Sequence, residues 1–233
     1  MRKVRPILFT GPNVQNILSG RKHLTRREMK PQPQKNGAFW EWGGAGWSLD
    51  RGPVPCVPRH SMSTRCPYGT PGDLLYVKEA AWMWCERVPN GTTPTGRAKY
   101  RYAPLRSAPV HYVADHPERP TVDVASPCTG NQWGWRYKAA RFLPRWATRI
   151  TLVTTCVRIE RLQDISEADA LAEGAEAISL DSEIYATAKD VFSDIWESIN
   201  GPGAWARDPW VWVVEFQPHH MNADRLLEES RHG

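Results

Sequence analysis

Residues 20–27 read Gly-Arg-Lys-His-Leu-Thr-Arg-Arg and set four cations beside one hydroxyl. The cations are Arg21, Lys22, Arg26 and Arg27, and the hydroxyl belongs to Thr25. The apolar residues just before them, Val14, Ile17 and Leu18, recur at the spacing of one helix face. Gly20 can adopt the left-handed conformation in which helices commonly end, so a reversal of the chain is predicted there.

This basic turn suits a phosphate, a carboxylate or a nucleic-acid backbone, and a solvated basic loop is the alternative interpretation. Side chains alternate along a strand. Lys22 and Thr25 therefore share a face only if a bend or bulge lies between them.

Outward from this stretch, turn residues and β-branched runs predict several strands. Their ranges are 5–10, 74–79, 149–160 and 210–216. Two helices are expected, one after Ser166 that stops at Gly174 and one over residues 183–199 with a broad apolar stripe. Many β segments with few helices predict an α+β fold, a small β-barrel or curved sheet with helices at its rim, and not a βαβ repeat.

Two stretches interrupt this pattern. Residues 31–65 are rich in Pro, Gly and Trp without periodicity, so we expect an irregular insertion. Residues 87–141 form a second insertion, either functional or folded on its own. The prediction is a single domain over residues 1–217, followed by a flexible tail, 218–233.

Bulk properties limit the partners. The 233 residues carry a net charge of +5 and 12 tryptophans. A basic chain favours an anionic partner, and Trp among Arg can stack bases or fill a core. No apolar run is long enough for a membrane helix or a signal peptide, so a cytoplasmic protein is expected.

The five cysteines do not suggest a disulfide framework. Cys56, His60 and Cys66 are the candidates for a metal site, but their spacing matches no zinc pattern, so reduced structural thiols are favoured. No metal and no cofactor are predicted.

Four motifs resemble those of the ASCH family, which has a PUA-like β-barrel fold. The basic stretch is similar to "G-[RK]-K-T-x-T-x-R", and residues 71–77 are similar to "x-G-D-x-L-x-V". Residues 162–173 and 212–216 resemble the next segment and the closing strand. The signatures at residues 66–73 and 199–216 resemble ASCH proteins of tailed bacteriophages and prophages, which implies a bacterial host cell. The two insertions lie outside the resemblance.

The resemblance implies a function. Similar small bacterial ASCH proteins include N4-acetylcytidine amidohydrolases, which use a Lys, a Thr and a Glu. Position by position, these fall on Lys22, Thr25 and Glu173. The chain departs from the family at His23, where Thr is usual, and that departure concerns the substrate more than the chemistry.

The chemistry is reasonable because a Thr hydroxyl attacks an amide only when a base takes its proton. Lys22 can be that base if burial or cationic neighbours lower its pKa. Glu173 would orient Lys22, carry a proton or bind the base edge, although it also stabilises protonated Lys22. The alternative interpretation is that Lys22 and Glu173 form a plain ion pair and Thr25 is a sheet residue.

A rival hypothesis is a module that binds RNA or single-stranded or modified nucleic acid without catalysis. Arginines are interleaved with aromatic residues in the second insertion, and Arg145 and Trp146 follow it. Together with Arg21, Arg26 and Arg27 they are the candidate binding residues. Core filling is the alternative for most of the aromatics. A ribonuclease ranks third, because neither a His pair nor metal carboxylates are evident.

Overall fold

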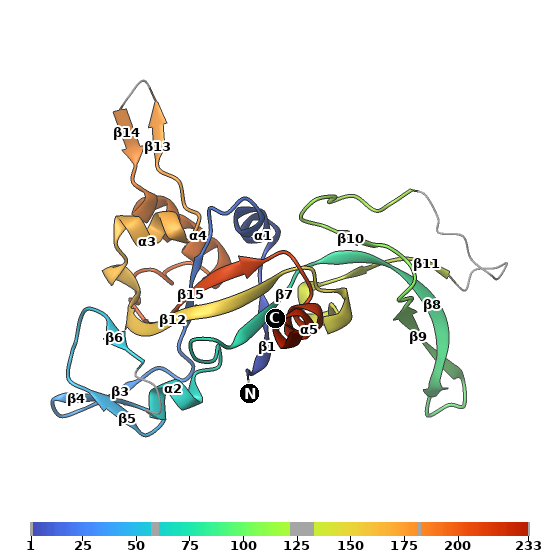
Figure 1. Ribbon diagram of the computed structural model, residues 1–233, viewed down its shortest axis with the longest axis horizontal. Coiled ribbons are helices and arrows are strands. Elements are labelled where there is room, and N and C mark those ends of the chain that lie inside the picture. The colour runs from blue at the N-terminus through green and yellow to red at the C-terminus, as the bar shows by residue number, and fades with distance from the viewer. Residues whose placement is uncertain (1, 57–60, 122–132, 181–182, 233) are drawn as a thin grey trace.

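The computed structural model of the chain describes residues 2–56, 61–121, 133–180 and 183–232. Within them the fold is α+β, with most ordered residues in strands and five helices around them (Figure 1). One large sheet forms the body, and three smaller sheets project from it. The predicted α+β class is therefore confirmed.

The main sheet is formed by six strands that are far apart in sequence. In order across the sheet they are β1 (Val4–Leu8), β7 (Leu74–Lys78), β12 (Thr151–Arg161), β15 (Trp210–His219) and β2 (Leu24–Glu28), with the short β6 (Val54–Pro55) paired to β12. β1 runs parallel to β7, and the other neighbours are antiparallel. The four predicted strands thus all lie in one sheet.

β15 lies inside the sheet and is buried on both faces, which explains its continuous apolar sequence. One face carries Trp210, Trp212 and Val214 into the main core, where α1 (Gly11–Leu18) also packs. The other face carries Val211 and Val213 into a second core. Alternation along the strand sends consecutive residues to these two cores.

The second core is covered by two helices, α3 (Glu167–Ala172) and α4 (Ala188–Asn200). The predicted cap of α3 is confirmed, since Ser166 accepts a hydrogen bond from the backbone N–H of Asp169. The predicted start of α4 is wrong. Thr187 begins that helix in a capping box with Asp190.

The residues expected in the first turns of α4 form a hairpin instead. β13 (Ile178–Leu180) pairs with β14 (Glu183–Ala186), and the hairpin projects above α3 and α4 (Figure 1). The apolar periodicity of this stretch continues into the helix and favours an earlier start, whereas the Thr187 and Asp190 spacing is the sequence signal of the true one.

The first insertion is not irregular, contrary to the prediction. β3 (Gln34–Asn36), β4 (Phe39–Trp42) and β5 (Ala45–Trp47) form a small sheet, and α2 (Ser61–Arg65) follows. Trp40 and Trp47 pack edge-on against Trp210, with ring centroids 5.6 and 5.2 Å away. Aromatic packing therefore holds this insertion on the main core.

The second insertion is folded into a sheet of its own, here called the arm. Its strands are β8 (Ala81–Thr92), β9 (Ala98–Pro104), β10 (Val110–Tyr112) and β11 (Trp133–Lys138). β8 pairs with each of the other three. The arm extends away from the body on the side opposite α3 and α4 (Figure 1). Of the two predicted alternatives, a folded segment is the one observed.

The prediction of a flexible tail is also wrong. β15 continues to His219, and α5 (Ala223–His232) follows. The Asn222 side chain holds the start of α5 by donating to the backbone carbonyl oxygens of Arg145 and Thr148, at 2.7 and 3.1 Å. A polar composition hid this helix because a few anchoring contacts suffice to order it.

The two edge strands of the main sheet, β1 and β2, have no ladder between them in the described residues. Arg27 of β2 bridges this gap. Its guanidinium donates to the Leu8 carbonyl oxygen at 2.6 Å and lies 4.8 Å from the ring of Phe9. The sheet is therefore strongly curved, and its free edge at β2 is the place where the candidate site forms.

Candidate active site

Lys22 is positioned by the reversal that the sequence predicted. α1 ends at Ser19, and Gly20 has φ +77°. The backbone N–H of Lys22 then donates to the Asn16 carbonyl oxygen at 2.9 Å, and that of His23 donates to the Ala172 carbonyl oxygen at 3.0 Å. This bend precedes β2 and turns the Lys22 side chain inward, where it is 1% exposed.

Glu173 meets Lys22 from the end of α3. It is the C-cap of that helix, and Gly174, with φ +88°, turns the chain away. The Lys22 ammonium group donates to the Glu173 carbonyl oxygen at 2.8 Å and also to its carboxylate oxygen Oε2. The ion pair is buried on both sides, so its geometry is fixed by the fold.

Thr25 lies on β2 beside this pair. Its neighbour across the sheet is Val214, and its side chain is 3% exposed. Its hydroxyl has no hydrogen-bond partner among the residues that the structure describes and lines the same pocket as Lys22. Because β2 is an edge strand, residues of both its faces reach this pocket.

Arg26 is fixed by two carboxylates under α3. Its guanidinium donates to Glu160 from Nε at 3.1 Å and to Asp169 at 2.6 Å, and its side chain is fully buried. Arg158 donates to the same Asp169 oxygen at 2.6 Å. Two carboxylates, each also bound by Arg158, therefore hold the Arg26 guanidinium in a single orientation.

Two atoms of this arrangement make no hydrogen bond. Arg26 Nη1 and Glu173 Oε1 form a long ion pair at 3.8 Å, and neither has a hydrogen-bond partner within the described part of the chain. Native proteins pair nearly all their buried polar atoms, so an unpaired donor beside an unpaired acceptor needs an explanation. Both residues line the pocket, so a ligand there could satisfy both atoms at once.

The pocket has a volume of about 80 Å³ and lies between the free edge of β2, the start of α1 and one face of α4. Its wall is apolar on the α4 side, with Phe192, Ile195, Trp196 and Ile199 at successive helical spacings. Its remaining lining is polar and includes Asn13, Glu28 and Asn200. A flat polar group can lie against the apolar wall and direct its edge toward the charged residues.

Burial lowers the pKa of Lys22 below its ordinary value of 10.5, even though the Glu173 carboxylate raises it. Arg27 and Arg26 lower it further, because two nearby cations disfavour a third. The lowered pKa makes the neutral amine easier to form than it is in an exposed lysine. Lys22 therefore has the environment of a general base as well as that of an ion-pair partner.

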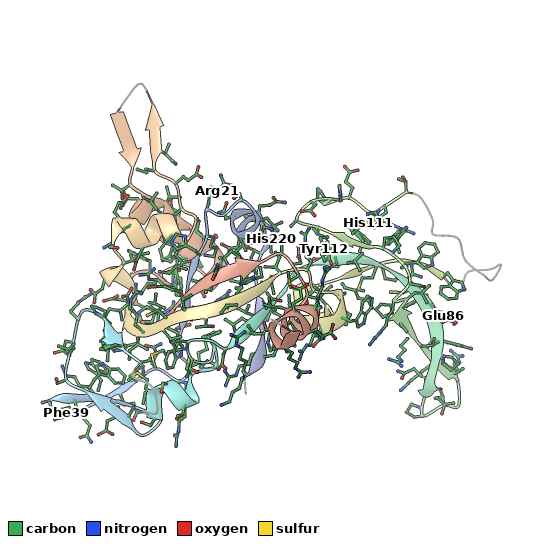
Figure 2. All side chains as sticks on the ribbon, in the orientation of Figure 1. Arg21, Phe39, Glu86, His111, Tyr112 and His220 are labelled. Atoms are coloured by element: carbon green, nitrogen blue, oxygen red, sulfur yellow. The ribbon has the colours of Figure 1, made fainter. Side chains whose placement is uncertain are left out.

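The structure brings most of the predicted site residues together. Lys22, Thr25 and Glu173 all line the pocket, and so do Arg26 and Arg27. Arg21 does not, since it is exposed beside α1, pairs with Glu176 at 2.9 Å, and points away from the sheet (Figure 2).

Arg145 and Trp146 are also remote from this pocket. Arg145 pairs with Asp224 of α5 at 2.5 Å and lies over the Tyr76 ring. Trp146 packs at the root of the arm, against Leu143 and Ala147. Neither residue contributes to the pocket.

Sequence reasoning missed the apolar wall of the pocket. The stripe of α4 was predicted without a role for it, and two of its members, Phe192 and Trp196, also belong to the second core. It also missed Glu160 and Asp169, which hold Arg26. The available signal was Arg158 and Glu160, two charged residues on one face of a strand rich in β-branched residues, which indicates a buried ion-pair network.

The candidate metal ligands give no site in the described residues. Cys56 and Cys66 are buried, and burial raises the pKa of their thiols to about 12 and about 11. His60 lies outside the described residues. Searching the described residues revealed no cluster of metal-ligating side chains.

No helix in the described part of the chain has the length and apolar character needed to span a bilayer. Comparison of the chain with protein-family models, with curated proteins and with solved structures found no match. The geometry of the pocket and the motifs that line it are therefore the guides to function.

Proposed function

We propose that the chain is an amidohydrolase that removes the acyl group from an N4-acylated cytosine, with the curved sheet as an ASCH-type PUA-like barrel. One observation carries the proposal. Lys22, Thr25 and Glu173, the positions that resemble the family's catalytic residues, are up to 151 residues apart in the chain and line a single pocket. The bridge from Arg27 across the sheet edges is the feature that supports the barrel.

The unpaired atoms suit the proposed substrate. The pairing edge of an N4-acylated cytosine offers an acceptor at N3 beside a donor at N4–H. Arg26 Nη1 is a free donor and Glu173 Oε1 a free acceptor, and they lie 3.8 Å apart. The cytosine edge would satisfy both atoms, and the ring would lie against the apolar wall of α4.

In the first step, neutral Lys22 accepts the proton of the Thr25 hydroxyl, and the hydroxyl oxygen attacks the acyl carbonyl carbon. The tetrahedral intermediate then collapses. The bond between the acyl carbon and N4 breaks, and N4 takes the proton back from Lys22 as cytosine leaves. The acyl group remains on Thr25 as an ester.

Water completes the reaction. Lys22, neutral again, takes a proton from water, which attacks the ester carbonyl carbon. The Thr25 oxygen leaves and regains the proton, and a carboxylic acid is released. Glu173 orients the Lys22 amine through Oε2 and the cytosine edge through Oε1. It therefore positions both the amine that carries the proton and the N4 atom that receives it.

The test is release of cytidine and acetate from N4-acetylcytidine by the purified chain. Equal amounts of both products are expected, and Arg21→Ala is the matched control because Arg21 lies outside the pocket. Absence of product with wild-type protein would overturn the proposal. Lys22→Ala is a poor test, since Lys22 is fully buried in an ion pair and its removal would also disturb the fold.

A further inference from the structure

We propose that the arm carries a second site, a surface that binds single-stranded nucleic acid through its phosphates and the faces of its bases. The proposal does not depend on hydrolysis in the pocket. The arm lies on the opposite side of the body from α3 and α4 (Figure 1), and a different set of residues carries the argument.

Charge is the first observation. Residues 81–146 contain ten Lys and Arg and four Asp and Glu, a net charge of +6. The whole chain carries +5, so all the other residues together sum to −1. The basic character of this protein is thus a property of one segment, which is the electrostatic pattern of a polyanion-binding surface.

The pairing of the strands places three of these cations, Arg87, Arg136 and Lys138, on one face. Arg87 of β8 is directly opposite Tyr102 of β9, and Tyr100 is opposite Pro89, two residues further along β8. Arg136 of β11 is opposite Met83, which also shares the face of Arg87. We call the face with Arg87, Tyr100, Tyr102, Arg136 and Lys138 the basic face.

No carboxylate shares this face in the described residues of β8, β9 and β11. Their one acidic residue is Glu86 of β8, which lies opposite Ala103 and Trp133 and so points to the other side of the arm sheet. It is labelled on the arm in Figure 2. The cations of the basic face therefore have no competing anion from the strands themselves.

The aromatic rings orient the cations. The guanidinium carbon of Arg87 lies 3.8 Å from the Tyr100 ring centroid, and that of Arg136 lies 4.0 Å from the centroid of Tyr102. Neither arginine forms an ion pair among the described residues. Arg136 donates one N–H to the Trp135 carbonyl oxygen at 3.2 Å, and its other N–H groups make no hydrogen bond among the described residues. A guanidinium held over a ring in this way can offer its remaining N–H groups to phosphate oxygens, and the pre-ordering lowers the entropic cost of binding.

At the root of the arm the same face ends in an open hollow. It is lined by Pro104, Tyr137, Lys138, Phe142, Pro144 and Trp146. Phe142 is 61% exposed, although such a large apolar side chain is normally covered. Two more arginines lie over these rings, Arg106 over Trp146 at 5.5 Å and Arg141 over Phe142 at 4.7 Å.

The basic face and the hollow form one track with alternating rings and cations. An unpaired base can stack on Phe142 or Trp146, whereas the bases of a duplex are already stacked and cannot. The occupant is therefore a single strand. Its sugar is not read, because phosphate contacts and ring stacking involve no 2′-hydroxyl.

The experiment is fluorescence anisotropy of labelled oligonucleotides with the full chain, in 50 mM NaCl. The probes are a uridine 20-mer, a thymidine 20-mer and a 20-base-pair duplex. We expect the two single strands to bind alike and at least tenfold more tightly than the duplex. No binding by wild-type protein, or tightest binding to the duplex, would overturn the proposal.

The deciding variant is Arg87→Gln with Arg136→Gln. Its matched control is Arg2→Gln with Arg207→Gln, which removes the same charge from exposed positions outside the arm. We expect the first pair to raise Kd about tenfold and to lower the slope of log K against log salt by about 1.4, since each phosphate contact contributes about 0.7 for a single strand. The control should change Kd less than twofold.

An equal loss of affinity from the arm pair and from the control pair would show a general effect of net charge and would overturn the proposed site. Unchanged binding by the arm pair would do the same. Phe142→Ser separates the two parts of the track, because it should weaken binding several-fold and leave the salt slope unchanged. Circular dichroism melting of each variant ensures that a lost arm fold is not read as lost contacts.

Discussion

Arginine has opposite roles in the pocket and in the arm. Arg26 is fully buried, and Glu160 and Asp169 hold it from two sides. Arg87 is exposed, lies on a tyrosine ring and has no carboxylate on its face of the sheet. The pocket uses its cation to fix the positions of other atoms, whereas the arm presents its cations to something outside the protein.

The difference shows that a buried arginine contributes to the fold, whereas an exposed arginine is available to bind a partner. Burying a charge is costly, so the pocket contains nearly matched cations and anions, and only a few of its polar atoms lack a hydrogen bond. An exposed cation costs little, so the arm can hold a net charge of +6 within 66 residues. Four comparisons test this contrast, in order from the largest expected effect to the smallest.

Arg26→Met should destabilise the protein by about 3–5 kcal/mol, because it leaves the buried Glu160 and Asp169 carboxylates without their shared partner. Arg87→Met should change stability by less than about 0.5 kcal/mol. Urea unfolding of the two variants measures both values. If Arg26→Met were as stable as Arg87→Met, the buried network would not be a fixed part of the fold.

Glycines offer a second comparison. Gly174, next to Glu173, has φ +88°, and a Cβ there would approach Asn16 Nδ2 to 2.5 Å. Gly96 at the arm tip has φ +78° with open space around it. We expect Gly174→Ala to cost about 2–3 kcal/mol and Gly96→Ala about 1 kcal/mol, since only the first adds a clash to the backbone strain.

Thermal unfolding of the two alanine variants gives the difference. Gly174→Ala should also lower turnover, because Asn16 accepts the backbone hydrogen bond of Lys22 and would be displaced. Equal melting temperatures for the two variants would show that the approach of Asn16 is not close enough to matter.

The pH dependence of turnover tests the environment of Lys22. The base must be neutral, so kcat/KM for N4-acetylcytidine should rise about tenfold per pH unit below the pKa of Lys22 and then level off. Burial lowers that pKa, so the plateau should begin below pH 10.5. A rate that keeps rising through pH 10.5 would contradict the proposed base.

Salt should have the smallest effect on the pocket. N4-acetylcytidine is uncharged and the charges of the pocket are buried, so kcat/KM should change less than about twofold between 50 and 200 mM NaCl. Binding of single strands to the arm should fall steeply over the same range. A pocket that loses activity in parallel with arm binding would mean that the two sites are not separate.

The parts of this site that sequence predicted are those that local chemistry determines. A glycine at a helix end, a hydroxyl cap and a basic turn each act within a few residues, so Gly20, Ser166 and Gly174 took their expected places. The resemblance added Glu173, which no local rule would have joined to Lys22 across the chain.

The rest depended on tertiary contacts. The strands of the first insertion are held by Trp40 and Trp47 on Trp210, far away in the chain. A helical stripe looks the same whether it faces a core or a pocket, so the predicted stripe of α4 did not reveal that it lines one. Likewise, α5 is ordered by Asn222, whose partners lie more than 70 residues away.

The account depends most directly on the Thr25 hydroxyl, and the decisive measurement is kcat/KM for N4-acetylcytidine with Thr25→Val and Thr25→Ser. The hydroxyl has no hydrogen bond to lose among the described residues, so both variants should fold. We expect Thr25→Val to lose at least about a thousandfold and Thr25→Ser to stay within about tenfold of wild type, since serine restores the nucleophile. Full activity in Thr25→Val would contradict the proposed mechanism.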